Sequence, residues 1–132
     1  MIKISNLFIG VFYMSRRVAL LEEMVVLLDR LIETATELNE VAVHACTEED
    51  LVPLQEQQKE ILAHLRGLDD LVKKEAPQKD ERQIKQRLIQ KVNAFQKLNQ
   101  DFLTHVESRF RVICQRGLHP EVLRDLQRSF SE

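Results

Sequence analysis

Three pairs of an acidic residue and a histidine come closest, by residue type and spacing, to a chemical site. In each pair the carboxylate stands four positions before the imidazole, so both side chains lie on one face of a helix. The pairs are Glu40 with His44, Glu60 with His64, and Asp101 with His105. Di-iron helical bundles instead use Glu-x-x-His at three-residue spacing, directed into the core. Because these pairs also lie off the apolar positions, we interpret them as surface pairs that stabilise helices and expect no metal site.

The other reactive side chains lack the partners that catalysis requires. Cys46 and Cys114 have no CxxC spacing and no accompanying ligand set, which indicates buried or half-buried thiols in a reducing, cytoplasmic environment. A phosphate-binding loop would need several clustered glycines, whereas the three glycines of this chain are isolated. No serine has a base positioned beside it in the sequence pattern. We therefore expect no enzyme activity and no cofactor.

The formal net charge of −2 hides an uneven distribution of charge along the chain. The segment Val18–Ala76 contains 14 acidic and 5 basic residues, whereas Arg82–Arg116 contains 8 basic and 2 acidic residues. We expect the basic segment to lie beside the acidic ones, in exposed pairs that contribute only about 0–1 kcal/mol each. The charged face of the basic segment has no stacking aromatic residues, so we expect no binding to nucleic acid.

The N-terminal segment could be mistaken for a membrane or export signal. The apolar run at residues 7–13 is much shorter than the roughly 20 residues of a transmembrane helix. The arginine pair at 16–17 resembles a twin-arginine signal, but acidic residues at 22–23 stand where its apolar segment would follow. We expect residues 1–15 to be an N-terminal extension, either disordered or mis-started, with Met14 as the natural start and residues 1–13 upstream of it, and we expect no membrane insertion.

Composition and periodicity predict long helices around one core. The 132 residues suit a single domain, and the scarcity of Gly, Pro and aromatic residues favours helices over sheets. The first predicted helix runs from about Arg16 to about Cys46, with apolar residues at alternating steps of three and four. These residues are Leu21, Met24, Leu28, Leu31, Ala35, Leu38, Ala42 and Ala45.

A second helix is predicted between the turn at residues 47–50 and a connection at residues 75–80. We prefer Asp50 over Thr47 as its N-cap, because Pro53 would then occupy the third helical position, where its missing N–H has no partner. Its apolar seam has the same stepping, with Leu62 and Leu71 alongside. The seam consists of Leu51, Leu54, Gln58, Ile61, Leu65, Leu68 and Val72.

The third predicted helix, from about Glu81 to about Arg116, is the longest. The connection before it is short, so we expect the second and third helices to be antiparallel neighbours. Its stripe repeats every 3.6 residues or so, which is the period of a straight helix and predicts an elongated molecule. The stripe consists of Ile84, Leu88, Val92, Phe95, Asn99, Phe102, Val106, Phe110 and Ile113.

The last predicted helix is short and amphipathic. It begins near Glu121, after a helix-ending Gly117, and Val122, Leu123 and Leu126 share one face with Phe130. Such a short helix is marginal alone, so it either folds back onto the bundle or is a mobile arm that completes a contact with a partner. The predicted fold is all-α, an elongated antiparallel three-helix bundle over residues 16–116 with a short C-terminal fourth helix within residues 117–132.

Asn99 is the polar residue of greatest interest, because it stands between Phe95 and Phe102 in the apolar stripe. A buried asparagine fixes helix register and must find hydrogen-bond partners. Alternatively the stripe is locally open and Asn99 faces water. An open stripe would leave part of an apolar groove that a partner helix could close.

Three segments of the chain resemble the small flagellar export chaperones of the FliT and FlgN type. They are the Glu-Glu-Asp-Leu turn at 48–51, the Leu-Gln-Glu-Gln-Gln-Lys-Glu-Ile-Leu run at 54–62, and Lys-Leu-Asn-Gln-Asp-Phe at 97–102. The resemblance covers residues 16–116. The short connection at residues 77–80 is closer to the FliT type, whereas Leu98-Asn99 is closer to the FlgN type, and the choice between them stays open.

The resemblance implies a cytoplasmic protein that binds a flagellar client before type III secretion. It would shield the helical terminal segment of a filament cap or hook–filament junction protein and deliver it to export-gate components. A client helix needs only an apolar groove. We predict that changing Val106 and Phe110 to Asp abolishes client binding and leaves the bundle folded. The predicted partner-binding residues are Asn99, Phe102, Val106, Phe110, Ile113, Leu123 and Leu126.

A second hypothesis comes from the same apolar residues. If the apolar surfaces of two copies close against each other, the chain is a self-associating helical coiled coil with a structural or adaptor role. A stable homodimer in light scattering would favour this hypothesis, although a chaperone of this type can also dimerise.

Overall fold

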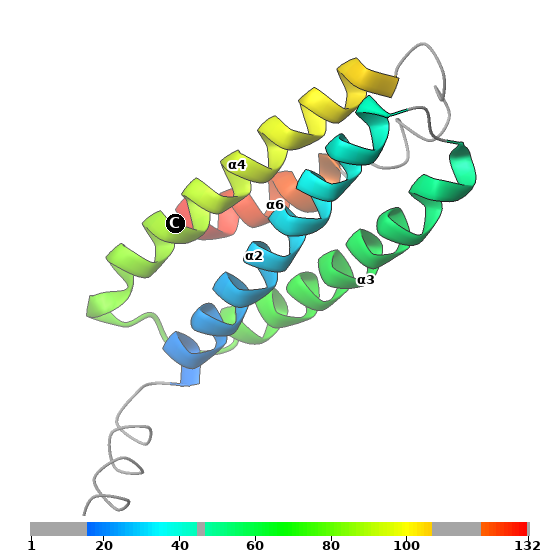
Figure 1. Cartoon of the computed structure of the whole chain (residues 1–132). Coiled ribbons are helices and arrows are strands. Elements are labelled where there is room, and N and C mark those ends of the chain that lie inside the picture. Colours follow the sequence, from blue (N-terminus) through cyan, green and yellow to red (C-terminus); the bar gives the residue numbers. More distant parts are fainter. Residues whose placement is uncertain (1–15, 45–46, 107–119, 132) are drawn as a thin grey trace, which may run out of the picture.

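A computed structural model describes residues 16–44, 47–106 and 120–131, which form helices joined by short connections (Figure 1). The helices are α2 (Arg16–Val43), α3 (Glu48–Lys73), the 3-10 turn η1 (Lys79–Glu81), α4 (Arg82–Val106) and α6 (Pro120–Ser131). Three long helices and a short C-terminal one confirm the predicted all-α bundle. The expectations for residues 1–15, for the two cysteines and for Phe110, Ile113 and Gly117 lie outside the described residues.

The four helices alternate in direction. Ion pairs join Glu22 to Arg87 and Asp29 to Lys91, so α2 and α4 run parallel. The helix α3, which comes between them in the sequence, runs in the opposite direction. The helix α2 packs along both α3 and α4, and α6 lies across the bundle from α2, against α4 and α3 (Figure 1). The described parts of α3 and α4 hardly touch each other directly. Their antiparallel directions are as predicted, but the prediction that they are direct neighbours was wrong, because α2 and α6 lie between them.

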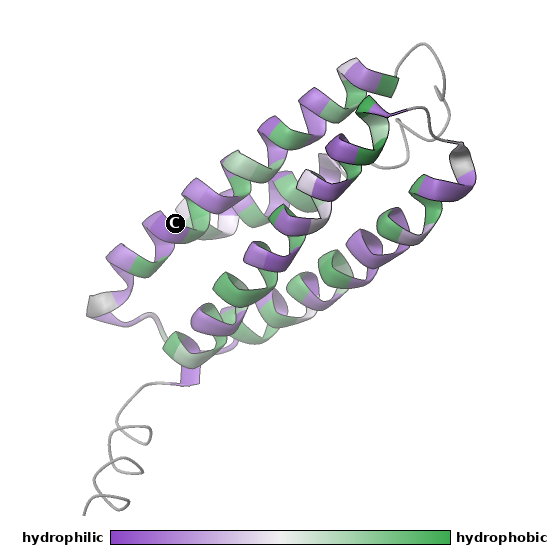
Figure 2. Ribbon diagram, viewed as in Figure 1, coloured by the Kyte–Doolittle hydropathy of each residue, from purple (hydrophilic) through white to green (hydrophobic). Residues whose placement is uncertain are grey.

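The apolar residues point inward and form two clusters. Hydrophobic and hydrophilic residues alternate along every helix, as expected for amphipathic helices (Figure 2). The main cluster joins all four helices, from Leu21 to Ala35 of α2 through to Phe130 of α6. A smaller cluster lies at the other end of the bundle. It consists of Leu38, Ala42, Leu51, Phe102 and Val106.

The seams predicted for the helices match the buried residues closely. In α4 the buried residues are Ile84, Leu88, Val92, Phe95, Asn99, Phe102 and Val106, the whole described part of the predicted stripe. In α2 every seam residue from Leu21 to Ala42 is buried. In α3, however, Leu71 is exposed, so its placement beside the seam was wrong.

Opposite charges on α2 and α4 meet as predicted. The Lys91 ammonium hydrogen-bonds to Asp29, and Arg87 lies 3.7 Å from Glu22. These side chains are at least partly exposed, so each pair contributes about 0–1 kcal/mol. The pairs therefore select the arrangement of the helices more than they stabilise it.

The start of α3 differs from the prediction. Thr47 is the N-cap, and the Asp50 carboxylate accepts hydrogen bonds from the Thr47 backbone N–H at 2.9 Å and from its hydroxyl at 3.3 Å. Asp50 therefore acts as the third residue of a capping box and not as the cap itself. Pro53 consequently lies inside the helix, one turn further on than we expected.

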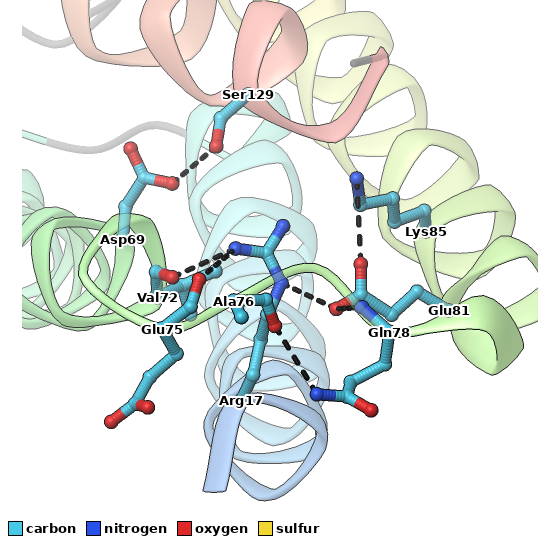
Figure 3. A network of polar contacts seen from close by, with 9 residues as sticks. All are labelled: Arg17, Asp69, Val72, Glu75, Ala76, Gln78, Glu81, Lys85 and Ser129. Carbon is cyan, nitrogen blue, oxygen red and sulfur yellow. Dashed lines mark hydrogen bonds and ion pairs between the residues drawn. The ribbon is translucent and has the colours of Figure 1, made fainter. Parts of the chain in front are cut away.

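A partly buried cation ties one end of the bundle together (Figure 3). The Arg17 guanidinium of α2 donates to the carbonyl oxygens of Val72, at 2.8 Å, and Glu75, at 3.0 Å, at the end of α3, and it pairs with the buried Glu81 carboxylate. The carbonyls at the end of a helix lack the usual partners within that helix, so Arg17 adds a side-chain donor to the Val72 carbonyl, which also accepts from the Glu75 N–H at 3.1 Å, and supplies a donor to the Glu75 carbonyl just after α3. Glu81 also accepts from the Gln78 N–H at 3.1 Å, which fixes the start of α4.

Among the described helices, none is both long enough and apolar enough to cross a membrane.

Candidate functional site

The candidate site is the groove between α3 and α4 that α6 fills. Three apolar side chains of α6, Leu123, Leu126 and Phe130, are buried at 1–3% exposure and belong to the main cluster. Their spacing of i, i+3 and i+7 is the one by which an amphipathic helix binds an apolar groove. Of the two outcomes left open for this segment, the structure has the docked one. We call this surface, between α3 and α4 and under α6, the α6 groove.

The α4 rim of the α6 groove presents hydrogen-bond acceptors. The side-chain amide of Gln127 donates to Asn93 Oδ1 at 3.0 Å and to Gln96 Oε1 at 2.9 Å. Both hydrogens of one NH₂ group are thereby used on two neighbouring turns of α4. This contact fixes the position of α6 along α4. It also fixes which side of α6 faces α4.

The α3 rim is charged, and α6 meets it through a hydroxyl. Ser129 donates to Asp69 Oδ1 at 2.5 Å, and Lys73 lies 3.2 Å from Asp69 Oδ2 (Figure 3 shows the Ser129–Asp69 contact). Asp69 is buried, at 3% exposure, so its carboxylate needs these partners to offset the loss of water. Further along this rim Arg66 lies 3.7 Å from Asp125, but both side chains are exposed and the pair is weak.

The predicted partner-binding residues fall into three places. Leu123 and Leu126 belong to α6 and lie in its groove, whereas Asn99, Phe102 and Val106 are buried along α4. Phe110 and Ile113 lie outside the described residues. The five described residues are thus covered in the isolated chain, and a partner could reach them only after α6 or another helix moves. Asn99 is buried as in the first of its two predicted alternatives.

A polar layer separates the two apolar clusters. The Asn39 side chain donates to the carbonyls of Ala35, at 2.9 Å, and Leu98, at 3.0 Å, and so links α2 to α4. Its Oδ1 and the buried Nε2 of Gln58 have no hydrogen-bond partner among the described residues. A buried polar atom without a partner costs about 1–3 kcal/mol, so these two atoms oppose the apolar packing on either side of the layer.

The three acidic residue and histidine pairs lie on the surface of the bundle. All six side chains are exposed, as expected for pairs that lie off the apolar seams. Within the described ranges, no three side chains of the metal-binding types come together. Exposed pairs at this spacing stabilise their own helices by about 0.2–0.5 kcal/mol each.

Sequence reasoning missed the polar contacts that hold α6. Gln127, Asn93, Gln96, Ser129 and Asp69 all flank apolar stripes, where polar residues are ordinarily solvated. One signal was available: Asp69 stands four residues after Leu65 and one after Leu68, within the widened apolar face of α3. A carboxylate at such a position predicts burial with a partner from another element.

Comparisons of the chain with protein-family models, with curated proteins and with solved structures find no match.

Proposed function

We propose that the chain is a cytoplasmic export chaperone that binds the helical terminal segment of a flagellar axial protein before type III secretion. The client is a filament cap or hook–filament junction protein, and its helix occupies the α6 groove after α6 leaves. Two observations support the proposal: the resemblance of residues 16–116 to such chaperones, and the seating of an amphipathic helix in the groove. The second carries it, since α6 already behaves as a ligand of the bundle.

A chaperone of this kind needs shape and apolar surface, and no reaction. A client helix with apolar residues at i, i+3 and i+7 would bury them where Leu123, Leu126 and Phe130 lie now. Because α6 competes for the same surface, the client's apparent affinity is reduced by the fraction of chains in which the groove is closed. Weakening the docking of α6 should therefore strengthen client binding.

Whether a substitution in α6 strengthens or weakens client binding distinguishes two versions of the proposal. If Leu126 contacts the client, as the sequence analysis predicts, Leu126→Ala weakens binding. If Leu126 belongs to the competing helix, Leu126→Ala strengthens binding, and the geometry of α6 favours this second outcome. The exposed residue Arg124 offers a matched control on the same helix, because Arg124→Ala leaves the apolar contacts intact.

The test is a titration of the purified full chain with terminal helical segments of filament cap and hook–filament junction proteins from the same organism. Isothermal titration calorimetry should show saturable binding of one such segment, tighter for Leu126→Ala and unchanged for Arg124→Ala. Absence of binding by every segment to both the native chain and Leu126→Ala would reject the proposal.

Light scattering on the same samples decides between this proposal and the self-associating coiled coil. The exposed large apolar residues of the described helices are few: Val26, Val43, Val52 and Leu71. They come from two helices, so the described helices leave little apolar surface for a second copy, and we expect a monomer. A dimer whose mass is unchanged on dilution, together with no client binding, would favour the structural role.

A further inference from the structure

We infer that the α6 groove selects its partner helix by polar groups at the two rims, and that α6 is the template of the helix selected. The partner helix carries apolar residues at i, i+3 and i+7, a side-chain amide at i+4 and a hydroxyl at i+6. It lies antiparallel to α4. This inference rests on the proposed function, because it describes the partner of the same groove.

The positions in the template come directly from the contacts of α6. With Leu123 as position i, Leu126 and Phe130 are i+3 and i+7, and all three are buried. Gln127 is then i+4 and Ser129 is i+6, and each makes the hydrogen bonds described above. Successive residues of a helix are about 100° apart, which places Gln127 on one side of the apolar stripe and Ser129 on the other.

The two rims differ in chemistry, and this difference discriminates between helices. The α4 rim offers the oxygens of Asn93 and Gln96, which suit a side chain with two N–H donors. A carboxylate at i+4 has no N–H to donate, so it cannot make these two contacts, and Asn93 and Gln96 would each have to turn the side-chain amide to meet it. The α3 rim offers the Asp69 carboxylate, which suits a hydroxyl and disfavours an acid.

The same difference sets the direction of the bound helix. In α6, residue 125 lies beside Arg66 and residue 129 beside Asp69, so α6 runs parallel to α3 and antiparallel to α4. A helix inserted in the opposite direction exchanges its two edges. Its amide would then meet the α3 rim and its hydroxyl the α4 rim, and the paired donor contacts with Asn93 and Gln96 would be lost.

The experiment uses fluorescent peptides and the full chain. The template peptide has the sequence of residues 120–131, and the receptors are full chains carrying Leu126→Ala or Phe130→Ala, each checked for retained helicity by circular dichroism. Fluorescence anisotropy should show that a Gln127→Glu peptide binds about fivefold more weakly than the template, from loss of one exposed and one part-buried hydrogen bond. An Arg128→Gln peptide has the same change in net charge at an exposed position and should bind like the template.

A compensating change in the receptor completes the test. On a receptor that also carries Gln96→Lys, the Gln127→Glu peptide should bind more tightly than the template, since a lysine and a carboxylate now face each other. Equal binding of the template and Gln127→Glu peptides would overturn the inference, as would failure of the template to bind either helical receptor. If the flagellar segments fail to bind while these peptide differences hold, the proposed function falls and this inference stands.

Discussion

The substitution Phe130→Ala should detach α6 and leave the rest of the bundle folded. Phe130 is one of three apolar side chains by which α6 is held, and it is 2% exposed. Truncation of a buried phenylalanine to alanine ordinarily costs about 3–5 kcal/mol in folding free energy. A helix of 12 residues is marginal in water by itself, so α6 depends on these contacts to remain helical.

The expected magnitude follows from what α6 can contribute. The apolar burial of the three anchors is opposed by the conformational entropy lost when α6 is ordered, and for so short a helix these two terms nearly cancel. The net free energy of docking is therefore a small difference, less than the loss of one large anchor. We expect α6 to leave the groove, so the free energy of global unfolding should fall by less than about 3 kcal/mol.

The assay compares local with global opening. Hydrogen exchange in Phe130→Ala should show lost protection at the α6 amides and retained protection in α2. Leu88→Ala serves as the matched control, since Leu88 is fully buried in α4 and its truncation should cost the full 2–5 kcal/mol in chemical denaturation. If the amides of α6 and α2 in Phe130→Ala exchange with the same free energy of opening, α6 unfolds together with the core and our reasoning fails.

Three further predictions concern the interior of the bundle. Glu81→Ala leaves the partly buried Arg17 without its counter-charge, so the free energy of unfolding should fall by about 3 kcal/mol, the lower end for a buried pair, and an unchanged denaturation midpoint would contradict this. Gln58→Leu removes a buried amide nitrogen that lacks a partner among the described residues, so the free energy of unfolding should rise by about 1 kcal/mol. The control Gln57→Leu changes an exposed residue and should have little effect. A lower free energy of unfolding in Gln58→Leu would show that the amide has a hydrogen-bond partner. Val106→Asp places a charge at a fully buried position, so circular dichroism should show a lower melting temperature. This differs from the sequence-based expectation that the bundle stays folded when Val106 is changed to Asp. An unaltered melting curve would mean that Val106 lies on an open surface.

The buried face of each long helix could be predicted because helical periodicity depends only on residues close together in the sequence. Along α4 the seven buried residues from Ile84 to Val106 are those of the predicted stripe, including Asn99. Apolar residues at this spacing leave one face of a helix that must be covered, whatever covers it. The sequence pattern therefore predicts which face of each helix is buried, even when the neighbouring helices are not known.

The helix start at Thr47 shows where local reasoning has two solutions. Both Thr47 and Asp50 can cap a helix, and Pro53 was used to choose between them. In the structure both contribute, Thr47 as the cap and Asp50 as the acceptor of its N–H, and α3 accommodates the proline within its first turns. The difference between the two starts is a few residues of helix, which propensity alone does not resolve.

The position of α6 and the buried charges depend on residues far apart in the chain. Gln127 meets Asn93 across 34 positions, and Arg17 meets Glu81 across 64. No local pattern marks these pairs, because each partner by itself is an ordinary polar residue at the edge of a stripe. The sequence showed that α6 has an apolar face and left open whether that face docks.

The most direct test of the central claim, that a partner helix enters the groove only when α6 leaves it, is a reversible lock on α6. Asp69→Cys with Ser129→Cys places thiols at two residues in hydrogen-bond contact on α3 and α6, in a chain whose Cys46 and Cys114 are changed to Ser. Mass spectrometry confirms the disulfide, and client binding is measured by calorimetry before and after reduction. We predict that the oxidised chain does not bind the client segment and that reduction restores binding. Equal affinity in the two states would contradict the claim and place the partner site on another surface.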